Sequence, residues 1–447
     1  MEQSMKAIVI AVALLWPAIE ASLDCSSVWN DNNHPLSNTS GAIRLTVLHH
    51  QHACSPVRNP AGLPFSRQRS TTLEREHQLA AHLSFRRRRA PPTNISAPVT
   101  SASSLSGFVT QIALGTPPTR QTVLIDSAAA FAWVQCVSCA EKEGCFDHDG
   151  PLFDPGASTT YRRLPCSSAS CVSASGNGDI PGLCAVQEST CVYYIEYMDS
   201  SASAGRVGTD MLTFGGQDLP GFVFGCSQRY AGAFGRYSGI FGFATGQLSF
   251  FSQVVERTRQ YKAFSYYLPS PTSVGYIQVG AYDEGGLDFT PMFTNGSDYY
   301  LALTGITVDG CPLDLTAGRG VAPRGTTVAA CYLDLGAAFS ILPRQAYDKL
   351  EDEVAKRIRG YDRIRSSPGC FDPDYLSAER VIPQVQLMFS HGVLLVLDQE
   401  KLMFRVGDGR LCLGFVPGTI YMLGRMQMQM MYAVQDIEKS RMGFSNK

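Results

Sequence analysis

The sequence has few charged residues, and the apolar run near its N-terminus is short. Asp, Glu, Lys and Arg make up 17% of the 447 residues, below the usual ~25%, which excludes a disordered acidic or basic protein. The apolar run covers residues 7–16, about half of the roughly 20 residues that a membrane-spanning helix needs. Residues 441–447 lack the small-residue site and apolar tail of a lipid-anchor signal. Collagen-like, coiled-coil and multi-span membrane proteins are also excluded, which leaves a globular, turn-rich chain.

Cysteines are plentiful by contrast, and they indicate an oxidising compartment. The chain has 14 Cys, more than a reduced cytosolic enzyme of this size typically carries. Lys6, the apolar run and small residues at Ala18 and Ala21 predict a signal peptide over residues 1–21. We therefore expect a secreted, extracellular protein, with the vacuole as the alternative. Three sequons, at Asn38, Asn94 and Asn295, agree with export.

Charge divides the chain near residue 89. Residues 1–89 hold 10 Lys+Arg against 6 Asp+Glu, whereas residues 90–447 hold 27 against 33, a net charge of −6. The junction is a run of four arginines at 86–89, followed by a Pro/Ser/Thr-rich stretch to about residue 106. A basic run can bind nucleic acid, but after a signal peptide it is more typical of an exposed processing site. We predict a pro-segment over 22–89, a linker over 90–106 and no nucleic-acid partner.

A histidine cluster lies inside the predicted pro-segment. His49, His50 and His52 are followed by Cys54, and imidazole and thiolate are ligands that suit zinc or copper. The alternative, which we prefer, is a plain strand with exposed histidines and no metal. Removal of residues 1–89 would leave 12 cysteines, an even number that allows six bridges.

From residue 108 onward the pattern is typical of a mostly β protein. Short apolar runs rich in Val, Ile, Phe, Thr and Tyr alternate with Gly, Pro, Asn and Asp. Helical signals are few. The best covers residues 343–358, with Pro343 at its start and apolar residues at helical spacing, and a shorter one covers 248–257.

A distant internal repeat is the most informative feature of the sequence. Residues 123–131 and 331–339 share an apolar strand, an aspartate, small residues and a final Phe. The aspartates are Asp126 and Asp334, and each is followed later by two apolar residues and a glycine, at 239–242 and 422–424. This order predicts two homologous β lobes, residues 107–270 and 271–447, each presenting one carboxylate at a strand end.

Two aspartates brought together at a lobe interface can perform acid–base chemistry. Like charges ~3 Å apart cannot both ionise, so the pair shares a proton. One carboxylate can then activate a water while the other protonates the scissile amide, without a metal or a cofactor. Either aspartate alone is more typical of an ordinary turn residue. Their duplication favours the catalytic interpretation.

These segments resemble the pepsin-like aspartic proteases, and specifically their nepenthesin-type plant branch. The similarity covers most of residues 104–447, in the order 115–118, 133–136, 224–226, 239–242, 248–253, 264–266, 334–343 and 423–444. Residues 49–56 are similar to the pro-segment of a plant subgroup named after a chloroplast nucleoid DNA-binding protease. The resemblance implies an all-β, bilobal fold, a protein or peptide substrate, and a monomer that is made as a zymogen.

The two aspartate loops depart from the pattern of that family. The family has Asp-Thr-Gly-Ser and Asp-Ser-Gly-Thr, whereas this chain has Ser127, Ala128 and Ala129 after Asp126. After Asp334 it has Leu335, Gly336 and Ala337. Of the four hydroxyls that support the two carboxylates in the family, the chain keeps only Ser127, and it keeps one loop glycine, Gly336. Loss of donors to a carboxylate should raise the apparent pKa of the pair, and the methyl of Ala128 should crowd the substrate side.

Two further departures concern the flap and the cysteines. By resemblance Tyr197 is the flap residue that closes over substrate, although a strand aromatic packed in the core is the alternative. The flap glycines of the family are replaced by Met198 and Ser200. One family bridge has lost its cysteines, and we expect Cys311 and Cys331 to form a bridge in its place.

Two functions of different class are consistent with these features. The first is an aspartic endopeptidase that uses Asp126 and Asp334, weakened by the altered loops. The second is a catalytically impaired protein of the same fold that binds or inhibits another protein. The two retained aspartates favour the first, and the lost hydroxyls favour the second.

Overall fold

The computed structural model describes residues 25–30, 42–57, 107–142, 144–171, 183–185, 189–197, 201–232, 234–313, 328–377, 379–406 and 409–445. The predicted signal peptide (1–21), the four arginines at 86–89 and the linker (90–106) lie outside these residues, as do Asn38, Asn94 and the flap residues Met198 and Ser200. We call residues 42–57 the N-terminal segment. Among all the residues that the structure describes, no helix is both long and apolar enough to cross a membrane.

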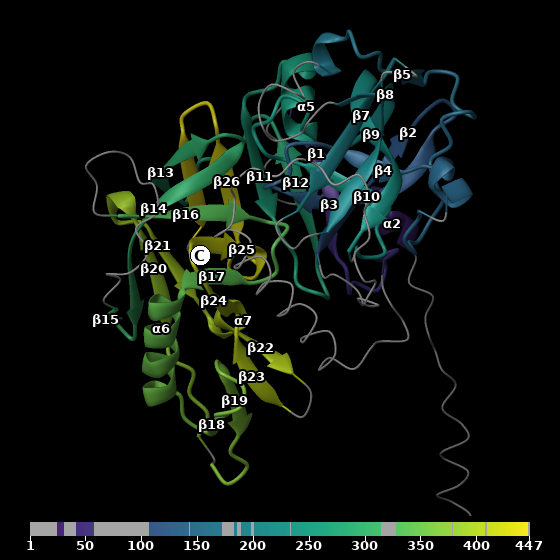
Figure 1. Cartoon of the computed structure of the whole chain (residues 1–447). Coiled ribbons are helices and arrows are strands. Elements are labelled where there is room, and N and C mark those ends of the chain that lie inside the picture. The colour runs from purple at the N-terminus through teal and green to yellow at the C-terminus, as the bar shows by residue number, and fades with distance from the viewer. Residues whose placement is uncertain are drawn as a thin grey trace, which may run out of the picture.

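The fold is mostly β and has two lobes, as predicted. Figure 1 shows the strands of the first half, in blue and teal, grouped apart from those of the second half, in green and yellow. The first half contains β2 (Phe108–Leu114), β3 (Thr119–Asp126), β4 (Trp133–Gln135), β5 (Arg162–Arg163), β6 (Leu183–Ala185), β7 (Thr190–Glu196), β8 (Ala202–Phe214), β9 (Gln217–Ala231), β10 (Gly239–Gly242), β11 (Ala263–Tyr267) and β12 (Val274–Val279). The second contains β13 (Leu287–Asn295), β14 (Asp298–Val308), β15 (Cys311–Pro312), β16 (Ala329–Asp334), β17 (Ser340–Pro343), β18 (Tyr361–Arg363), β19 (Cys370–Pro373), β20 (Val385–Phe389), β21 (Leu394–Leu397), β22 (Met403–Val406), β23 (Arg410–Leu413), β24 (Phe415–Gly418), β25 (Tyr421–Gly424), β26 (Tyr432–Asp436) and β27 (Arg441–Ser445).

The predicted repeat is visible in the strand pairing. In the first lobe β3 pairs in parallel with β10, so that Asp126 lies opposite Gly242. In the second lobe β16 pairs in parallel with β25, so that Asp334 lies opposite Gly424. A Cβ on Gly242 would lie 2.0 Å from the carbonyl oxygen of Ala129, which explains why this position is a glycine.

A shared sheet joins the two lobes. β11 pairs with β12 on one side and with β26 on the other, β26 pairs with β27, and β27 pairs with β13. The strand of the N-terminal segment, β1 (Ile43–His49), lies between β12 and β2 in this sheet. The segment therefore belongs to the structure that connects the lobes, and the expected boundary at residue 270 falls between β11 and β12.

Both predicted helices are present. α6 (Arg344–Arg357) begins after Pro343, which sits at its N-cap position, and buries Ala346, Leu350 and Val354. α5 (Phe250–Thr258) begins after Ser249, whose hydroxyl accepts from the Ser252 N–H at 3.0 Å. Shorter elements are α2 (Cys25–Asn30), α7 (Gln399–Leu402), α8 (Arg425–Met428), η1 (Val137–Lys142) and η2 (Ser390–Gly392).

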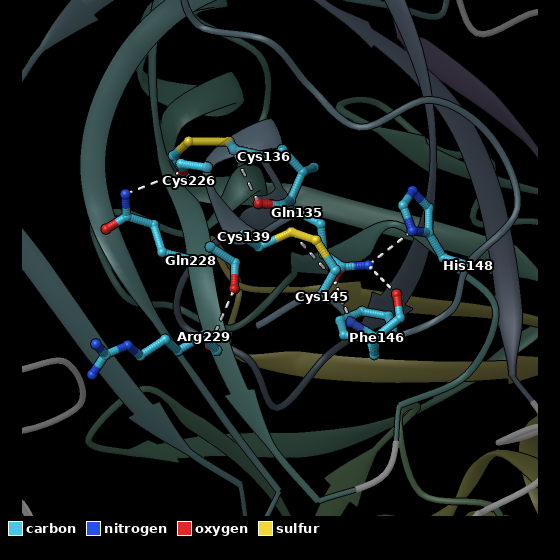
Figure 2. The surroundings of a disulfide bond; sticks show 12 residues. Gln135, Cys136, Cys139, Cys145, Phe146, His148, Cys226, Gln228 and Arg229 are labelled. Carbon is cyan, nitrogen blue, oxygen red and sulfur yellow. Dashed lines mark hydrogen bonds between the residues drawn. A yellow bond between two sulfur atoms is a disulfide. The ribbon is translucent and has the colours of Figure 1, made fainter. Parts of the chain in front are cut away.

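Disulfides stabilise the first lobe and the N-terminal segment. Cys25 is bonded to Cys54, and the lobe contains Cys136–Cys226, Cys139–Cys145, Cys166–Cys184 and Cys171–Cys191. Figure 2 shows two of these bridges beside the Gln135 side chain, which donates to the Phe146 carbonyl at 3.0 Å and accepts from the Phe146 N–H at 2.9 Å. Cys136–Cys226 therefore holds the end of β4 close to β9, and Cys139–Cys145 closes the loop that follows β4.

The predicted Cys311–Cys331 bridge is wrong, since both cysteines are free. Both lie on strands that pair with β14, where Cys331 is opposite Leu301 and Cys311 is opposite Val308. Seven residues of strand at about 3.3 Å each separate these positions by roughly 23 Å, whereas bonded cysteines have Cα atoms within about 7 Å. Cys370 and Cys412 instead lie directly opposite each other on β19 and β23.

Candidate active site

The two predicted aspartates lie at matching places in the two lobes. Asp126 ends β3 and Asp334 ends β16, and each side chain is largely buried, with 7% and 6% of its residue surface exposed. Each of these strands pairs in parallel with a strand that ends in a glycine opposite the aspartate. The fold therefore holds both carboxyl groups at buried strand ends, where the chain turns.

Backbone N–H groups of the following loops bind each carboxyl group. The Ala128 N–H donates to Oδ1 of Asp126 at 2.8 Å. In the second lobe the N–H groups of Gly336 and Ala337 donate to Oδ1 of Asp334 at 2.7 and 2.9 Å. Donors to a carboxylate favour its charged form, so the backbone supplies part of the support that the missing hydroxyls no longer give.

The structure brings the two loops together across the lobe interface. The Leu335 N–H donates to the Ser127 hydroxyl at 2.9 Å, and both groups are buried. A Cβ built on Gly336 would lie 2.8 Å from Cγ of Asp126. The peptide of one loop therefore lies directly against the carboxyl group of the other, and position 336 has room only for a glycine.

Several of the altered loop residues are packed as apolar side chains. Leu335 has 1% of its surface exposed and belongs to the main core cluster. Ala128, which we expected to crowd the substrate side, packs against the cluster of the second lobe that includes Tyr332 and Ala337. Ala129 is buried in the first lobe. Apolar contacts thus replace the polar network that the family pattern implies.

Tyr197 lies on the Asp126 side of this site. Its hydroxyl accepts a hydrogen bond from Nε1 of Trp133 at 2.7 Å, and its ring packs edge-on to Phe234 with centroids 6.1 Å apart. Burial raises the pKa of Tyr197 well above 10, the Trp133 donor opposes this shift, and the negative charge of Asp126 adds to it. The position suits a flap residue and a packed aromatic equally well.

The N-terminal segment packs into the same region. Val57 belongs to the apolar cluster that contains Trp133 and Leu124, against which Tyr197 packs. The His50 N–H donates to the Gly107 carbonyl at 3.0 Å, and the His49 ring lies 5.5 Å from that of Phe108. The strand predicted here is present, but our expectation of exposed histidines is wrong for His50 and His52, with 8% and 6% of their surfaces exposed.

The chemistry of the histidines reflects this burial. Burial and the positive charge of Arg425 lower the pKa of His49 to about 3. Burial, His49 and Arg425 lower the pKa of His50 well below 6.5, although its bond to Gly107 acts in the opposite sense. Cys54 is bonded to Cys25, and no group of three His, Cys, Asp or Glu in the described ranges is arranged to hold a metal.

Arg425 is a site residue that sequence reasoning missed. It directly follows Gly424, and only 5% of its surface is exposed. Its N–H donates to the Ala337 carbonyl at 3.0 Å, and Nη1 donates to the Gly336 carbonyl. The available signal was its place immediately after the second apolar-apolar-glycine motif.

Comparisons with known proteins agree with this fold. Residues 108–281 match the family model "Xylanase inhibitor N-terminal", and residues 298–446 match "Xylanase inhibitor C-terminal". Aspartyl protease 37 of Oryza sativa subsp. japonica is 31% identical over 384 residues, 75% of this chain and 79% of that protein. Aspartic proteinase nepenthesin-2 of Nepenthes gracilis is 26% identical over 350 residues, 75% of this chain and 76% of that protein.

Among solved structures, basic 7S globulin from soybean is similar in fold. It has a TM-score of 0.61 and 22% identity, over 76% of this chain and 93% of the globulin. At this level of identity the likeness concerns the fold alone.

Proposed function

Because the chain belongs to the plant pepsin-like aspartic proteases, we propose that it is an aspartic endopeptidase whose dyad is Asp126 and Asp334. The observation that carries the proposal is the contact between the two loops, in which the Leu335 N–H binds Ser127 and Gly336 lies against Asp126. This contact keeps two carboxyl groups from separate lobes at one site. Ser127 and Gly336 are then the residues that support the dyad.

The proposed reaction is a general acid–base hydrolysis. The ionised carboxylate takes a proton from a water molecule, whose oxygen attacks the carbonyl carbon of the scissile peptide bond. The protonated carboxyl group donates its proton to the carbonyl oxygen, which gives a tetrahedral diol. The C–N bond then breaks as the other carboxyl group passes the proton taken from water to the leaving nitrogen and a hydroxyl of the diol returns a proton to the first. Tyr197 is the proposed flap residue, which covers the substrate and excludes bulk water. The reaction needs no metal and no cofactor.

The N-terminal segment is proposed to belong to a pro-segment over residues 22–89, joined by a linker over 90–106 to the lobes at 107–270 and 271–447. Its strand pairs with β2 and β12, and Val57 reaches the cluster beside Trp133. A substrate would need this region, so the segment keeps the enzyme inactive until it leaves. The five described disulfides are typical of maturation in an oxidising compartment. We propose secretion as a monomer, with the vacuole as the alternative destination.

The test is hydrolysis by the purified chain from residue 22 onward, between pH 3 and 6. We expect self-cleavage upstream of residue 107, then pepstatin-sensitive cleavage of a peptide substrate. D126N and D334N should each lower kcat by roughly a thousandfold or more, because removal of one member of a catalytic unit abolishes most of its effect. Hydrolysis that survives the double variant D126N/D334N would show that the dyad is not responsible.

A second function has specific support. Ala129 and Ala337 replace hydroxyls of the family pattern, and the matching family models carry the name xylanase inhibitor. The alternative is therefore a protein-binding module without hydrolytic activity. Stoichiometric binding to a xylanase by calorimetry, together with no hydrolysis by a folded, fully bridged chain at any pH, would favour it over the protease.

A further inference from the structure

We propose that Arg425 is a positioning residue for Asp334. Its positive charge replaces the support that a hydroxyl at position 337 would give to the carboxylate. The inference rests on the proposed function, since it assigns a role within the same dyad. The peptide unit that joins Gly336 to Ala337 connects Arg425 with Asp334.

This peptide unit is bound at both ends. Its carbonyl oxygen, on Gly336, accepts from Nη1 of Arg425. Its N–H, on Ala337, donates to Oδ1 of Asp334 at 2.9 Å. A cation that binds the oxygen of an amide polarises the amide and makes its N–H a stronger donor. The guanidinium therefore acts on the Asp334 carboxylate through a single peptide group.

A second contact fixes the same loop. The backbone N–H of Arg425 donates to the Ala337 carbonyl at 3.0 Å, so residue 425 binds two successive peptide units of the loop. The preceding residue, Gly424, is the strand partner of Asp334. The position and orientation of the Asp334 loop thus depend on Arg425. This residue follows directly on β25, the strand that pairs with β16 beside Asp334.

Burial makes this charge effective. Only 5% of the Arg425 surface is exposed, and charges interact more strongly where water is excluded. The titratable groups near it include Asp334 and Asp126 at the loops. They also include His49 and His50 on the N-terminal segment, and the charge of Arg425 lowers the pKa of these two histidines. The matching position of the first lobe, after Gly242, is Phe243 and has no charge. The assignment is therefore specific to the Asp334 side of the dyad.

The first test measures thermal stability and does not require activity. The unfolding midpoint of the full chain is measured at pH 7 and pH 3.5 in D126N, which should not cleave itself, alone and combined with R425Q, with D334N and with both. We expect R425Q to lower the midpoint more at pH 7 than at pH 3.5, by about 2–5 °C, because Asp334 is charged at the higher pH. The D334N background should remove this difference. Any pH dependence that persists with D334N comes from His49 and His50 and is removed with H49Q/H50Q.

Two variants serve as comparisons. R425K keeps the charge and should therefore lower the midpoint little at either pH, whereas a purely geometric role for the guanidinium would give R425K the same pH-dependent loss as R425Q. R344Q removes an exposed arginine of α6 that pairs with Asp348 and should change the midpoint little at either pH. Equal losses for R425Q at both pH values and in both backgrounds overturn the proposal.

The second test uses kinetics of the activated enzyme. R425Q should lower kcat about tenfold with little change in KM, and should move the acid limb of the pH profile upward by roughly half a unit to one unit. R425K should restore the acid limb. An unchanged pH profile for R425Q also overturns the proposal. If the wild type hydrolyses nothing, the proposed function fails by itself, and the stability measurements still decide whether Arg425 and Asp334 are coupled.

Discussion

Acid should release the N-terminal segment from the body of the protein through His49 and His50. Both histidines are neutral when the segment is docked, because burial and Arg425 lower the pKa of His49 to about 3 and that of His50 well below 6.5. The charged and titratable groups around them are Arg425 from α8 and His52 from their own turn, while β2 contributes the uncharged ring of Phe108. No acidic side chain is among the causes of either shift, so protonation in place is opposed.

The size and sign of the effect follow from linkage. The released histidines regain a pKa near 6.5 and bind protons that the docked ones cannot, so docking is unaffected above about pH 7 and weakens as the pH falls below 6.5. Each pKa unit corresponds to 1.36 kcal/mol, so at pH 4.5 His49 disfavours docking by about 2.7 kcal/mol, and His50 acts in the same direction. His49 alone shifts the docking equilibrium by roughly two orders of magnitude. The effect stops growing near pH 3, where docked His49 also titrates.

Hydrogen exchange of the strand β1 amides measures this release directly. The full-length D126N/D334N variant is used so that self-cleavage cannot occur, and exchange of peptides from residues 43–57 is corrected for the intrinsic effect of pH. Protection should fall steeply between pH 6.5 and 4.5. In H49Q/H50Q it should persist to lower pH, because glutamine does not titrate.

Controls distinguish this switch from general acid unfolding. H391Q changes an exposed histidine of the second lobe and should release the segment like the parent. Peptides of β3 and β16 should stay protected throughout. If H49Q/H50Q is already unprotected at pH 7.5, the single variant H49Q takes its place. Residue 49 is only partly buried, so its replacement should disturb the docked segment less. A release midpoint that is the same in the histidine variants and in the parent would refute the argument.

Three further outcomes can be checked. S127A removes the acceptor of the Leu335 N–H. It should lower the free energy of unfolding by about 1–3 kcal/mol, because a buried donor is left unsatisfied, and the denaturant midpoint should fall accordingly. An unchanged midpoint would mean that the contact does not hold the lobes. G336A places a methyl 2.8 Å from Cγ of Asp126 and should lower kcat at least about tenfold, whereas G156A, at an exposed turn, should not. Cys311 is exposed and should react with iodoacetamide in the native protein at pH 8. Cys331 is buried, which raises its pKa to about 12, so it should react only after unfolding. Protection of both cysteines in the native protein would contradict this expectation.

Much of the fold could be predicted because its signals are local or repeated. Alternating apolar residues and turn residues predicted the strands, and Pro343 with its helical spacing predicted α6. The duplicated aspartate and glycine motifs predicted the matching strand pairs in both lobes. These features depend on short-range periodicity and on comparison of the chain with itself.

Features that depend on contacts between distant segments could not be predicted. The burial of His50 requires β1 to pair with both β2 and β12, which the sequence around position 50 does not encode. The distance between Cys311 and Cys331 follows from the register along β14. An arginine near a turn is ordinarily solvated, so the burial of Arg425 depends on the loop that it binds.

The pattern of disulfides has a consequence for how long inhibition lasts after processing. The described bridges either join α2 to the N-terminal segment, as Cys25–Cys54, or lie within the first lobe, and none of them joins the segment to the lobe. While the chain is continuous, the segment is held at a high local concentration beside its binding site. A single cut between residues 57 and 107 turns it into a separate, cross-linked peptide whose occupancy depends on dilution. Inhibition after cleavage should therefore be reversible and dependent on protein concentration, and it should disappear as the peptide diffuses away.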